Sequence, residues 1–299
     1  MTIDRRTALA AGLALAAGAC VPIEHDLAGR FGALLRIIEA QGNGTLGVAV
    51  LDTGTGRVWG HADYARFPHL SSFKLSLAAL VLHLDETGAI DAGEHVTWST
   101  DDLLAYAPFA RERLEQGATL RELAEFTQKL SDNTAANLLL RRLGGPERLT
   151  AFWRALGDET SRLDRYEPEL NLVPPGEIKD TTTPAAMART LGKLLYGDAL
   201  GEAARATLKL WMADTHTGTK RVRAGLPPEW PAGDKTGTSL APGMGSVYVD
   251  VGYVEPPARA PLTFAAYFRA ARQHTAADAA SEAVLAEVGR VIARYARAT

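Results

Sequence analysis

The sequence of 299 residues contains a single cysteine, Cys20. One thiol has no partner within the chain, so we expect packing and hydrogen bonding, and no internal disulfide bond, to stabilise the fold. The chain also has no large excess of positive or negative charge: its formal net charge is −3 and its pI is about 6.2. That balance gives no electrostatic reason to bind nucleic acid or an anionic membrane surface, and we expect neither as a partner.

Metal and cofactor motifs are absent as well. The seven histidines form neither an H-E-x-x-H motif nor another pair with ligand spacing. The sequence has no G-x-S-x-G nucleophile elbow and no G-x-G-x-x-G motif within a β-α-β pattern. These absences argue against zinc hydrolases, α/β-hydrolases and dinucleotide-dependent enzymes, and we expect no metal and no cofactor.

The apolar stretch from Thr7 to Ala19 is shorter than the roughly 20 residues that a membrane-spanning helix needs. It follows Arg5 and Arg6 and ends in small residues before Cys20, as export signals do. We therefore place an export signal at residues 1–19, of either the twin-arginine or the Sec type. We expect export to the periplasm, with a membrane anchor only if Cys20 carries lipid.

Residues 20–299 are numerous enough to bury one large core. A helical period from residue 26 to 40 is followed by alternating apolar residues and a turn, which predict a β-hairpin. The next part is mainly helical in pattern, and strand patterns then return before a last helix with one apolar face. Strands at both ends predict an α/β (α+β) fold with one sheet built from both termini. We place its α/β lobe at about 26–66 and 216–299 and its helical lobe at about 67–215.

A serine and a lysine stand three residues apart at the start of an apolar run, Ser71 and Lys74. On a helix they would share a face, with the serine near unpaired N–H groups of the first turn. Serine becomes a nucleophile beside a base, and a lysine amine can be that base when its surroundings lower its pKa. Taken alone, the pair also fits a capped helix with a snorkelling lysine.

Two more short motifs carry polar groups. "SDN" ends in Asn133 at a helix start, where Ser131 and its neighbours are also ordinary N-caps. "KTGT" begins at Lys235, just before an expected strand. Gly237 in this motif permits a ligand to approach the backbone closely, and the lysine can hold a carboxylate. The alternative for this motif is a turn with a solvated lysine.

The stretch from Arg165 to Asp180 is rich in proline and has neither a helical nor a strand period. Loops this long without regular structure are usually functional or disordered. It contains "EPELN", in which Glu167 and Asn171 supply a carboxylate and an amide. The loop is therefore a candidate part of the same site.

In this order and at these separations, S-x-x-K, S-D-N and K-T-G are the signature of class A β-lactamases and penicillin-binding proteins. Glu167 and Asn171 favour the first group, because penicillin-binding proteins lack that pair. From about residue 26 to its end, the chain resembles class A serine β-lactamases closely. The resemblance implies a five-stranded antiparallel sheet flanked by terminal helices, an inserted helical lobe and an active site between them. It also implies a monomer that hydrolyses the β-lactam amide bond of antibiotics without a cofactor.

The resemblance implies a role for each motif residue. Ser71 would form the acyl-enzyme, Lys74 would take or relay its proton, and Ser131 would protonate the leaving nitrogen. Glu167 would activate the deacylating water that Asn171 orients. The substrate-binding residues would be Asn133, Lys235, Thr236, Gly237, Thr238, Arg221 and Tyr106, with the backbone N–H groups of Ser71 and Thr238 as the oxyanion hole, and Arg165 and Asp180 would close the loop as an ion pair.

Arg221 and Thr238 also resemble the carbapenem-hydrolysing subgroup of this family. That subgroup usually has a disulfide bond beside the active site, where this chain has Leu70 and Ser239. Carbapenem hydrolysis is therefore a hypothesis, and a surface position for Arg221 stays an alternative, as does a core position for Tyr106. For the whole protein, the alternatives are a D,D-peptidase, which would leave the Glu and Asn unexplained, and a penicillin sensor, which would need to lack the deacylation base.

Overall fold

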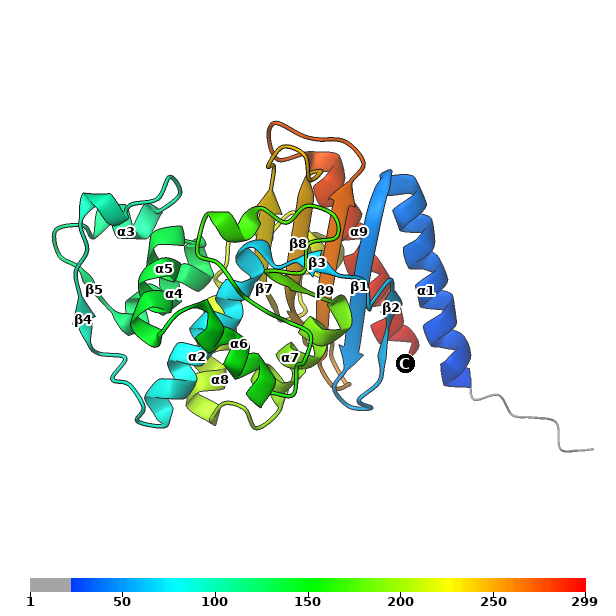
Figure 1. Ribbon diagram of the computed structural model, residues 1–299. Helices are drawn as coiled ribbons and strands as arrows, with labels where there is room; N and C mark the ends of the chain where they lie inside the picture. Colours follow the sequence, from blue (N-terminus) through cyan, green and yellow to red (C-terminus); the bar gives the residue numbers. More distant parts are fainter. Residues whose placement is uncertain (1–22) are drawn as a thin grey trace, which may run out of the picture.

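The computed structural model describes residues 23–299, so the expected export signal and Cys20 lie outside the described residues. Its centre is the expected five-stranded antiparallel sheet, and its strands lie in the order β2-β1-β9-β8-β7. Two long α-helices cover one face of this sheet, and the other α-helices lie on its opposite side (Figure 1). No helix within residues 23–299 is long and apolar enough to cross a membrane.

The two ends of the chain build this sheet together. Val48 in β1 lies opposite His61 of β2 on one side and Ala266 of β9 on the other. The predicted hairpin and the strands predicted after residue 215 are thus confirmed, and β7 forms an edge of the sheet. The strands are β1 (Gly44–Asp52), β2 (Val58–His61), β7 (Ala232–Ser239), β8 (Val247–Val254) and β9 (Leu262–Ala270).

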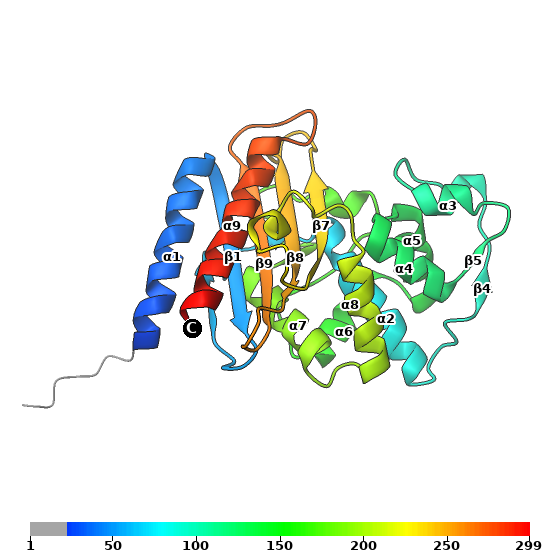
Figure 2. The same ribbon diagram turned by 180° about the vertical axis from the view of Figure 1, so that it is seen from behind.

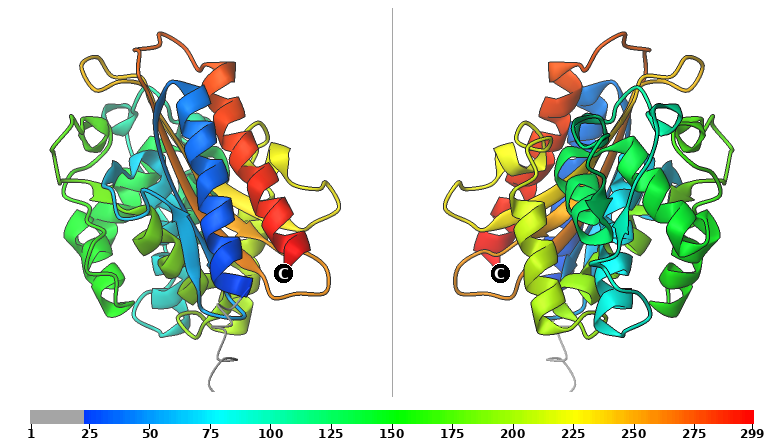
Figure 3. Two further views of the ribbon diagram at one scale, coloured as in Figure 1. Left: turned by 90° about the vertical axis from the view of Figure 1, so that its right-hand side faces the viewer. Right: turned by 90° about the vertical axis from the view of Figure 1, so that its left-hand side faces the viewer.

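Helices α1 (Ile23–Gly42) and α9 (Ala279–Ala298) run side by side across the outer face of the sheet (Figure 2, Figure 3). They pack against alternate residues of β1 such as Val48, whereas Ala49 belongs to the core on the opposite face. Both faces of the sheet are therefore covered. The apolar face predicted for the last helix is buried, with Val284, Leu285, Val288, Val291, Ile292 and Tyr295 all in the core.

The predicted helical stretch contains a central helix with other helices around it. Helix α2 (Phe73–Glu86) is buried along every face from Phe73 to Leu82, as expected for a helix that is apolar almost all round. The surrounding helices are α3 (Pro108–Glu112), α4 (Leu120–Leu130), α5 (Asn133–Leu143), α6 (Pro146–Ala155), α7 (Pro184–Tyr196) and α8 (Glu202–Ala213).

Two features of this region differ from the sequence pattern. Two short ribbons occur within it, β3 (Phe67–Pro68) with β6 (Thr181–Thr182) and β4 (His95–Val96) with β5 (Ala118–Thr119). Two-residue strands leave no periodic signal in a sequence, so none was expected. Helix α7 lies within the expected helical lobe by sequence, yet it packs on the sheet, where Thr263 of β9 donates a hydrogen bond to its backbone.

Candidate active site

Ser71 lies in a single 3-10 turn, η1 (Leu70–Ser72), that leads directly into α2. We expected it in the first turn of the α-helix itself. Leu70 has a φ of +49°, so the chain turns just before the serine. The spacing of three still brings the two side chains together, because Nζ of Lys74 donates a hydrogen bond of 2.9 Å to Oγ of Ser71.

Lys74 is fully buried, so the interpretation as a snorkelling surface lysine is wrong. Its Nζ donates to the backbone oxygen of Ser131 at 3.0 Å and to Oδ1 of Asn133. It also lies 2.9 Å from Oε1 of Glu167. A buried ammonium group is tolerated when its protons are bonded and its charge is paired, and here both conditions are met.

The S-D-N tripeptide joins α4 to α5 and serves two purposes. Asp132 is the N-cap of α5, with its carboxylate accepting from the backbone of Ala135 and of Ala110. Ser131 has a φ of +62°, which ends α4 and aims its side chain toward the lysines. Its Oγ accepts a hydrogen bond of 3.0 Å from Lys235. The capping interpretation thus holds for Asp132, while the residues on either side of it reach the site.

The long loop places Glu167 against α5. The carboxylate is buried, with 3% of the residue exposed, and Nδ2 of Asn171 donates to its Oε2. Asn137 of α5 clamps the backbone of Glu167 by donating to its oxygen at 2.8 Å and accepting from its nitrogen at 3.0 Å. We did not predict Asn137, although it follows Asn133 by four residues and therefore lies on the same face of the helix.

Arg165 and Asp180 join the two ends of this loop. The carboxylate of Asp180 is fully buried and also accepts the backbone N–H groups of Asp164 at 2.7 Å and Arg165 at 3.0 Å. The interpretation as an exposed and weak pair is therefore wrong. This clamp lies outside the cavity and acts on the loop that carries Glu167.

The K-T-G motif lies inside β7, not before a strand as we expected. Lys235 is fully buried, so the interpretation as a solvated lysine is also wrong. Burial lowers the pKa of Lys235 well below its usual value, and the ammonium of Lys74 acts in the same direction. A Cβ at Gly237 would lie 2.8 Å from Cβ of Leu70 and 3.1 Å from the nitrogen of Ser71, so glycine is needed for β7 to approach Ser71 this closely.

Arg221 is buried rather than a surface arginine, with 4% of the residue exposed. Its Nη2 donates a hydrogen bond of 2.6 Å to Oγ1 of Thr238. Thr236 lies on β7 with Thr238, and its Oγ1 is 2.6 Å from Oγ1 of Thr217, a residue outside that strand. Thr217 was not predicted, and no motif in its surroundings would have singled it out.

These side chains converge on one open cavity of about 320 Å³ between the helical part and β7. Tyr106 stands at its mouth with 53% of the residue exposed, so a core position for this tyrosine is wrong. Lys74 and Lys235 lie directly behind the lining. The lining residues are Ser71, Tyr106, Ser131, Asn133, Glu167, Asn171, Thr217, Arg221, Thr236, Gly237 and Thr238.

The arrangement suits acyl transfer. A hydroxyl bonded to the buried Nζ of Lys74 faces the cavity, a second hydroxyl lies between two lysines, and a carboxylate bonded to an amide lies beside the same Nζ. A nucleophile with an adjacent base, and a second base that reaches the same point, are what a two-step hydrolysis requires.

Known proteins share this architecture. Residues 31–296 match the model of the family described as "Beta-lactamase enzyme family". The chain is 43% identical over 303 residues to β-lactamase AST-1 of Nocardia asteroides, which covers 97% of this chain and 95% of that protein. It is 40% identical over 254 residues, 85% of each chain, to the carbapenem-hydrolyzing β-lactamase KPC of Klebsiella oxytoca.

Among solved structures, the class A β-lactamase of the last common ancestor of Gram-negative bacteria superposes with a TM-score of 0.83 at 46% identity, covering 88% of this chain and 98% of that one. Because these matches span most of the chain and the motif side chains meet in one cavity, the similarity extends from the fold to the chemistry. The chain therefore belongs to the β-lactamase enzyme family, as a class A β-lactamase that hydrolyses the amide bond of β-lactams.

Proposed function

We propose that hydrolysis runs through an acyl-enzyme on Ser71. Its Oγ attacks the lactam carbonyl carbon and gives up its proton toward the pair formed by Lys74 and Glu167, which are 2.9 Å apart. The negative charge on the carbonyl oxygen would be stabilised by the backbone N–H groups of Ser71 and Thr238. When the C–N bond breaks, the hydroxyl of Ser131 protonates the nitrogen, and the neighbouring lysines lie close enough to return that proton.

The second step removes the acyl group. Glu167 takes a proton from a water that Asn171 orients, and the resulting hydroxide attacks the acyl carbon. Ser71 leaves with a proton, and the product carries a new carboxylate in place of the lactam amide. The observation that carries this proposal is the placement of Glu167, buried in the cavity wall with Lys74 on one carboxylate oxygen and Asn171 on the other.

Substrate orientation would depend on the sheet side of the cavity and on two residues of the helical side. Lys235 and Arg221 supply positive charge for the carboxylate of a β-lactam. The hydroxyl of Thr238 accepts a hydrogen bond from Arg221, so its own proton is free to be donated to that carboxylate. Thr236 and Gly237 complete this edge, Asn133 would bond the acyl amide, and Tyr106 would pack on the substrate at the mouth.

The variant Glu167→Ala tests the division of labour. Acylation should proceed while deacylation stalls, so mass spectrometry should show a persistent adduct on Ser71 after mixing with a penicillin. Glu169→Ala is the matched control, because Glu169 lies in the same loop and is exposed. Normal turnover by Glu167→Ala would remove Glu167 from the role of deacylation base.

The alternative activities differ in the fate of the acyl-enzyme. A D,D-peptidase or a penicillin sensor would show a burst of nitrocefin cleavage equal to the enzyme concentration and then stop. We expect steady turnover after any burst, because Glu167, the proposed deacylation base, lines the cavity. A burst without turnover would favour the alternatives.

We also propose that carbapenems are among the substrates. The support is Arg221, which comes from a loop beside the cavity and binds Thr238 directly. Leu70 and Ser239 occupy the places where related enzymes with this activity usually have a disulfide bond, and here both residues are buried while β7 pairs with β8 along its whole length. No loss of carbapenem absorbance over hours with purified protein would refute this proposal.

Residues 1–19 are proposed to direct export to the periplasm by the twin-arginine or the Sec route, leaving residues 20–299 as one monomeric catalytic domain. Mass spectrometry of the protein from a periplasmic extract would locate the cleavage site, and fatty-acid labelling would show whether Cys20 is lipidated. Light scattering would give the oligomeric state. A mature protein that retains residues 1–19, or a stable dimer, would contradict the corresponding part.

A further inference from the structure

Arg221 is a buried cation whose ionic partners are few. Its Nη1 donates to the backbone oxygens of Gly237 at 2.9 Å and Val249 at 2.7 Å, in addition to the bond from Nη2 to Thr238. Its ion pair within the described residues is with Glu282, 3.4 Å from Nε. A guanidinium with so little exposure and one long ion pair needs further stabilisation from its surroundings.

Tyr248 supplies a surface for that guanidinium. The centre of its ring lies 5.6 Å from Cζ of Arg221, within the range of a cation–π contact. Tyr248 stands on β8 directly opposite Thr238 of β7, the residue whose hydroxyl Arg221 binds. The tyrosine is fully buried, and such a contact is stronger when water is excluded.

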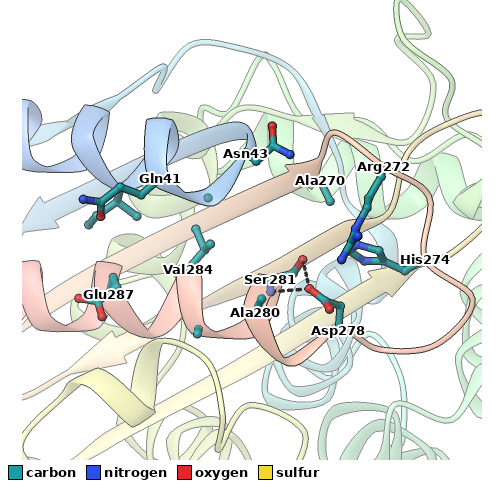
Figure 4. A pocket seen from close by; sticks show the side chains of 13 residues that line it. Gln41, Asn43, Ala270, Arg272, His274, Asp278, Ala280, Ser281, Val284 and Glu287 are labelled. Atoms are coloured by element: carbon teal, nitrogen blue, oxygen red, sulfur yellow. Dashed lines mark hydrogen bonds between the residues drawn. The ribbon is translucent and has the colours of Figure 1, made fainter.

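The hydroxyl of Tyr248 fixes the ring from its far end. It accepts a hydrogen bond of 3.0 Å from the backbone nitrogen of Asp278 and lies 2.8 Å from Nδ1 of His274. Asp278 in turn caps α9 by accepting from the backbone and the hydroxyl of Ser281, as Figure 4 shows. Glu282, the carboxylate partner of Arg221, lies in the first turn of α9. The start of α9 therefore positions both the ring of Tyr248 and the carboxylate of Glu282.

We propose that Tyr248 is a positioning residue of the active site: its ring holds the guanidinium of Arg221 against Thr238 and thereby sets the affinity for the substrate's carboxylate. This inference rests on the proposed role of Arg221 in binding that carboxylate. Tyr248 does not line the cavity. Its influence therefore passes through Arg221, and it should act on KM and leave the bond-breaking step alone.

Steady-state kinetics of Tyr248→Leu, Arg221→Ala and the double variant test the proposal. Each single variant should raise KM for a penicillin about fivefold or more, with kcat within about twofold of wild type. The double variant should be no worse than Arg221→Ala alone, because both residues act through one interaction. Effects that multiply in the double variant would overturn the proposal, since they would mean independent roles.

The roles of Arg221 and Tyr248 can fail separately. If Arg221→Ala leaves KM unchanged, the proposed role of Arg221 is overturned, and the role of Tyr248 with it. If Arg221→Ala raises KM and Tyr248→Leu does not, the role of Tyr248 alone is overturned. The matched control is Tyr295→Leu, because Tyr295 is another buried tyrosine whose ring lies 5.1 Å from an arginine, Arg259, at the far end of α9. It should lower the melting temperature and leave KM unchanged.

A second series keeps the shape of the side chain and covers the case that Tyr248→Leu does not fold. Tyr248→Phe, followed by replacement of Tyr248 with phenylalanines that carry one, two and three fluorines, preserves the ring and weakens its attraction for a cation step by step. KM should rise with each fluorine while the melting temperature changes little. A KM that stays constant along the series would overturn the proposal.

Discussion

The two walls of the active-site cavity each hold a fully buried lysine, but they stabilise it differently. On the helical wall, Lys74 has a carboxylate 2.9 Å away, that of Glu167, and neutral acceptors around its other protons. On the sheet wall, Lys235 donates to the hydroxyl of Ser131 and to the backbone oxygen of Thr236. Within residues 23–299, no carboxylate lies within ion-pair distance of its ammonium group.

We propose that this difference separates the chemistry from substrate binding. On the helical wall, the carboxylate of Glu167 balances the charge of Lys74, so these groups keep their geometry before a substrate arrives. The sheet wall combines Lys235 with the buried Arg221, and burial holds the pKa of the lysine well below its usual value. An arriving carboxylate would supply the missing negative charge there, and affinity should therefore depend on the sheet wall.

The largest effect is expected on the helical wall. Ser71→Ala removes the hydroxyl that Lys74 bonds, and kcat for nitrocefin should fall by at least about 10⁴-fold, the scale on which loss of a nucleophile acts in other serine hydrolases. Ser72→Ala is the control, because the adjacent Ser72 is buried and its hydroxyl donates to the backbone of His69. Similar losses in the two variants would contradict the assignment of the nucleophile.

A smaller effect, on binding, is expected on the sheet wall. Lys235→Ala should raise KM for a penicillin about 30-fold or more, the effect of removing one partner of a buried charge pair. The variant should also lose the preference of the enzyme for the free carboxylate over its methyl ester. Lys209→Ala, which changes a lysine of α8 that pairs with Glu255, should leave KM unchanged. An intact preference in Lys235→Ala would show that the carboxylate binds elsewhere.

The smallest effect concerns a buried acid behind the sheet wall. Burial raises the pKa of Asp250 well above its usual value, and the nearby Asp234 acts in the same direction. The folded state therefore holds its proton at pH values where the unfolded chain has released it, so this residue costs stability as pH rises above about 4. Asp250→Asn cannot ionise, and its stability relative to wild type should increase from pH 4 to pH 7 in urea unfolding.

The pH dependence of stability expected for Asp278 has the opposite sign, so a variant of Asp278 serves as the control for this measurement. A hydrogen bond from the backbone of Ser281 lowers the pKa of Asp278, so its carboxylate contributes stability at neutral pH that is lost as pH falls. Asp278→Asn should therefore lose stability relative to wild type as pH rises. Parallel pH dependence in the two variants would contradict the contrast between a buried acid and a capping acid.

Much of the fold could be predicted because its patterns are long. The hairpin of β1 and β2, the apolar face of α9 and the helices around α2 all have regular spacing over several turns or strands. The short ribbons could not be predicted, since two residues carry no period. The packing of α7 on the sheet could not be predicted, because the apolar face of a helix does not indicate which other helix or sheet will cover it.

The same distinction between local patterns and long-range contacts applies to the active site. Ser71 and Lys74 meet because residues three apart on one turn share a face, and Asp132 caps α5 by the chemistry of its own side chain. Asn137 and Thr217 could not be predicted from motifs, because their roles consist of contacts with residues far away in sequence.

The amino-acid sequence by itself determined which reactive groups this protein carries and the local geometry of each motif, because backbone preferences act over a few residues. Only the tertiary structure decided that Lys74 has a carboxylate partner while Lys235 is held by a hydroxyl and a backbone oxygen, and that Arg221 lies against Tyr248. Burial and long-range contacts set the charge balance of these groups, and they exist only once the sheet and the helices have closed around the cavity.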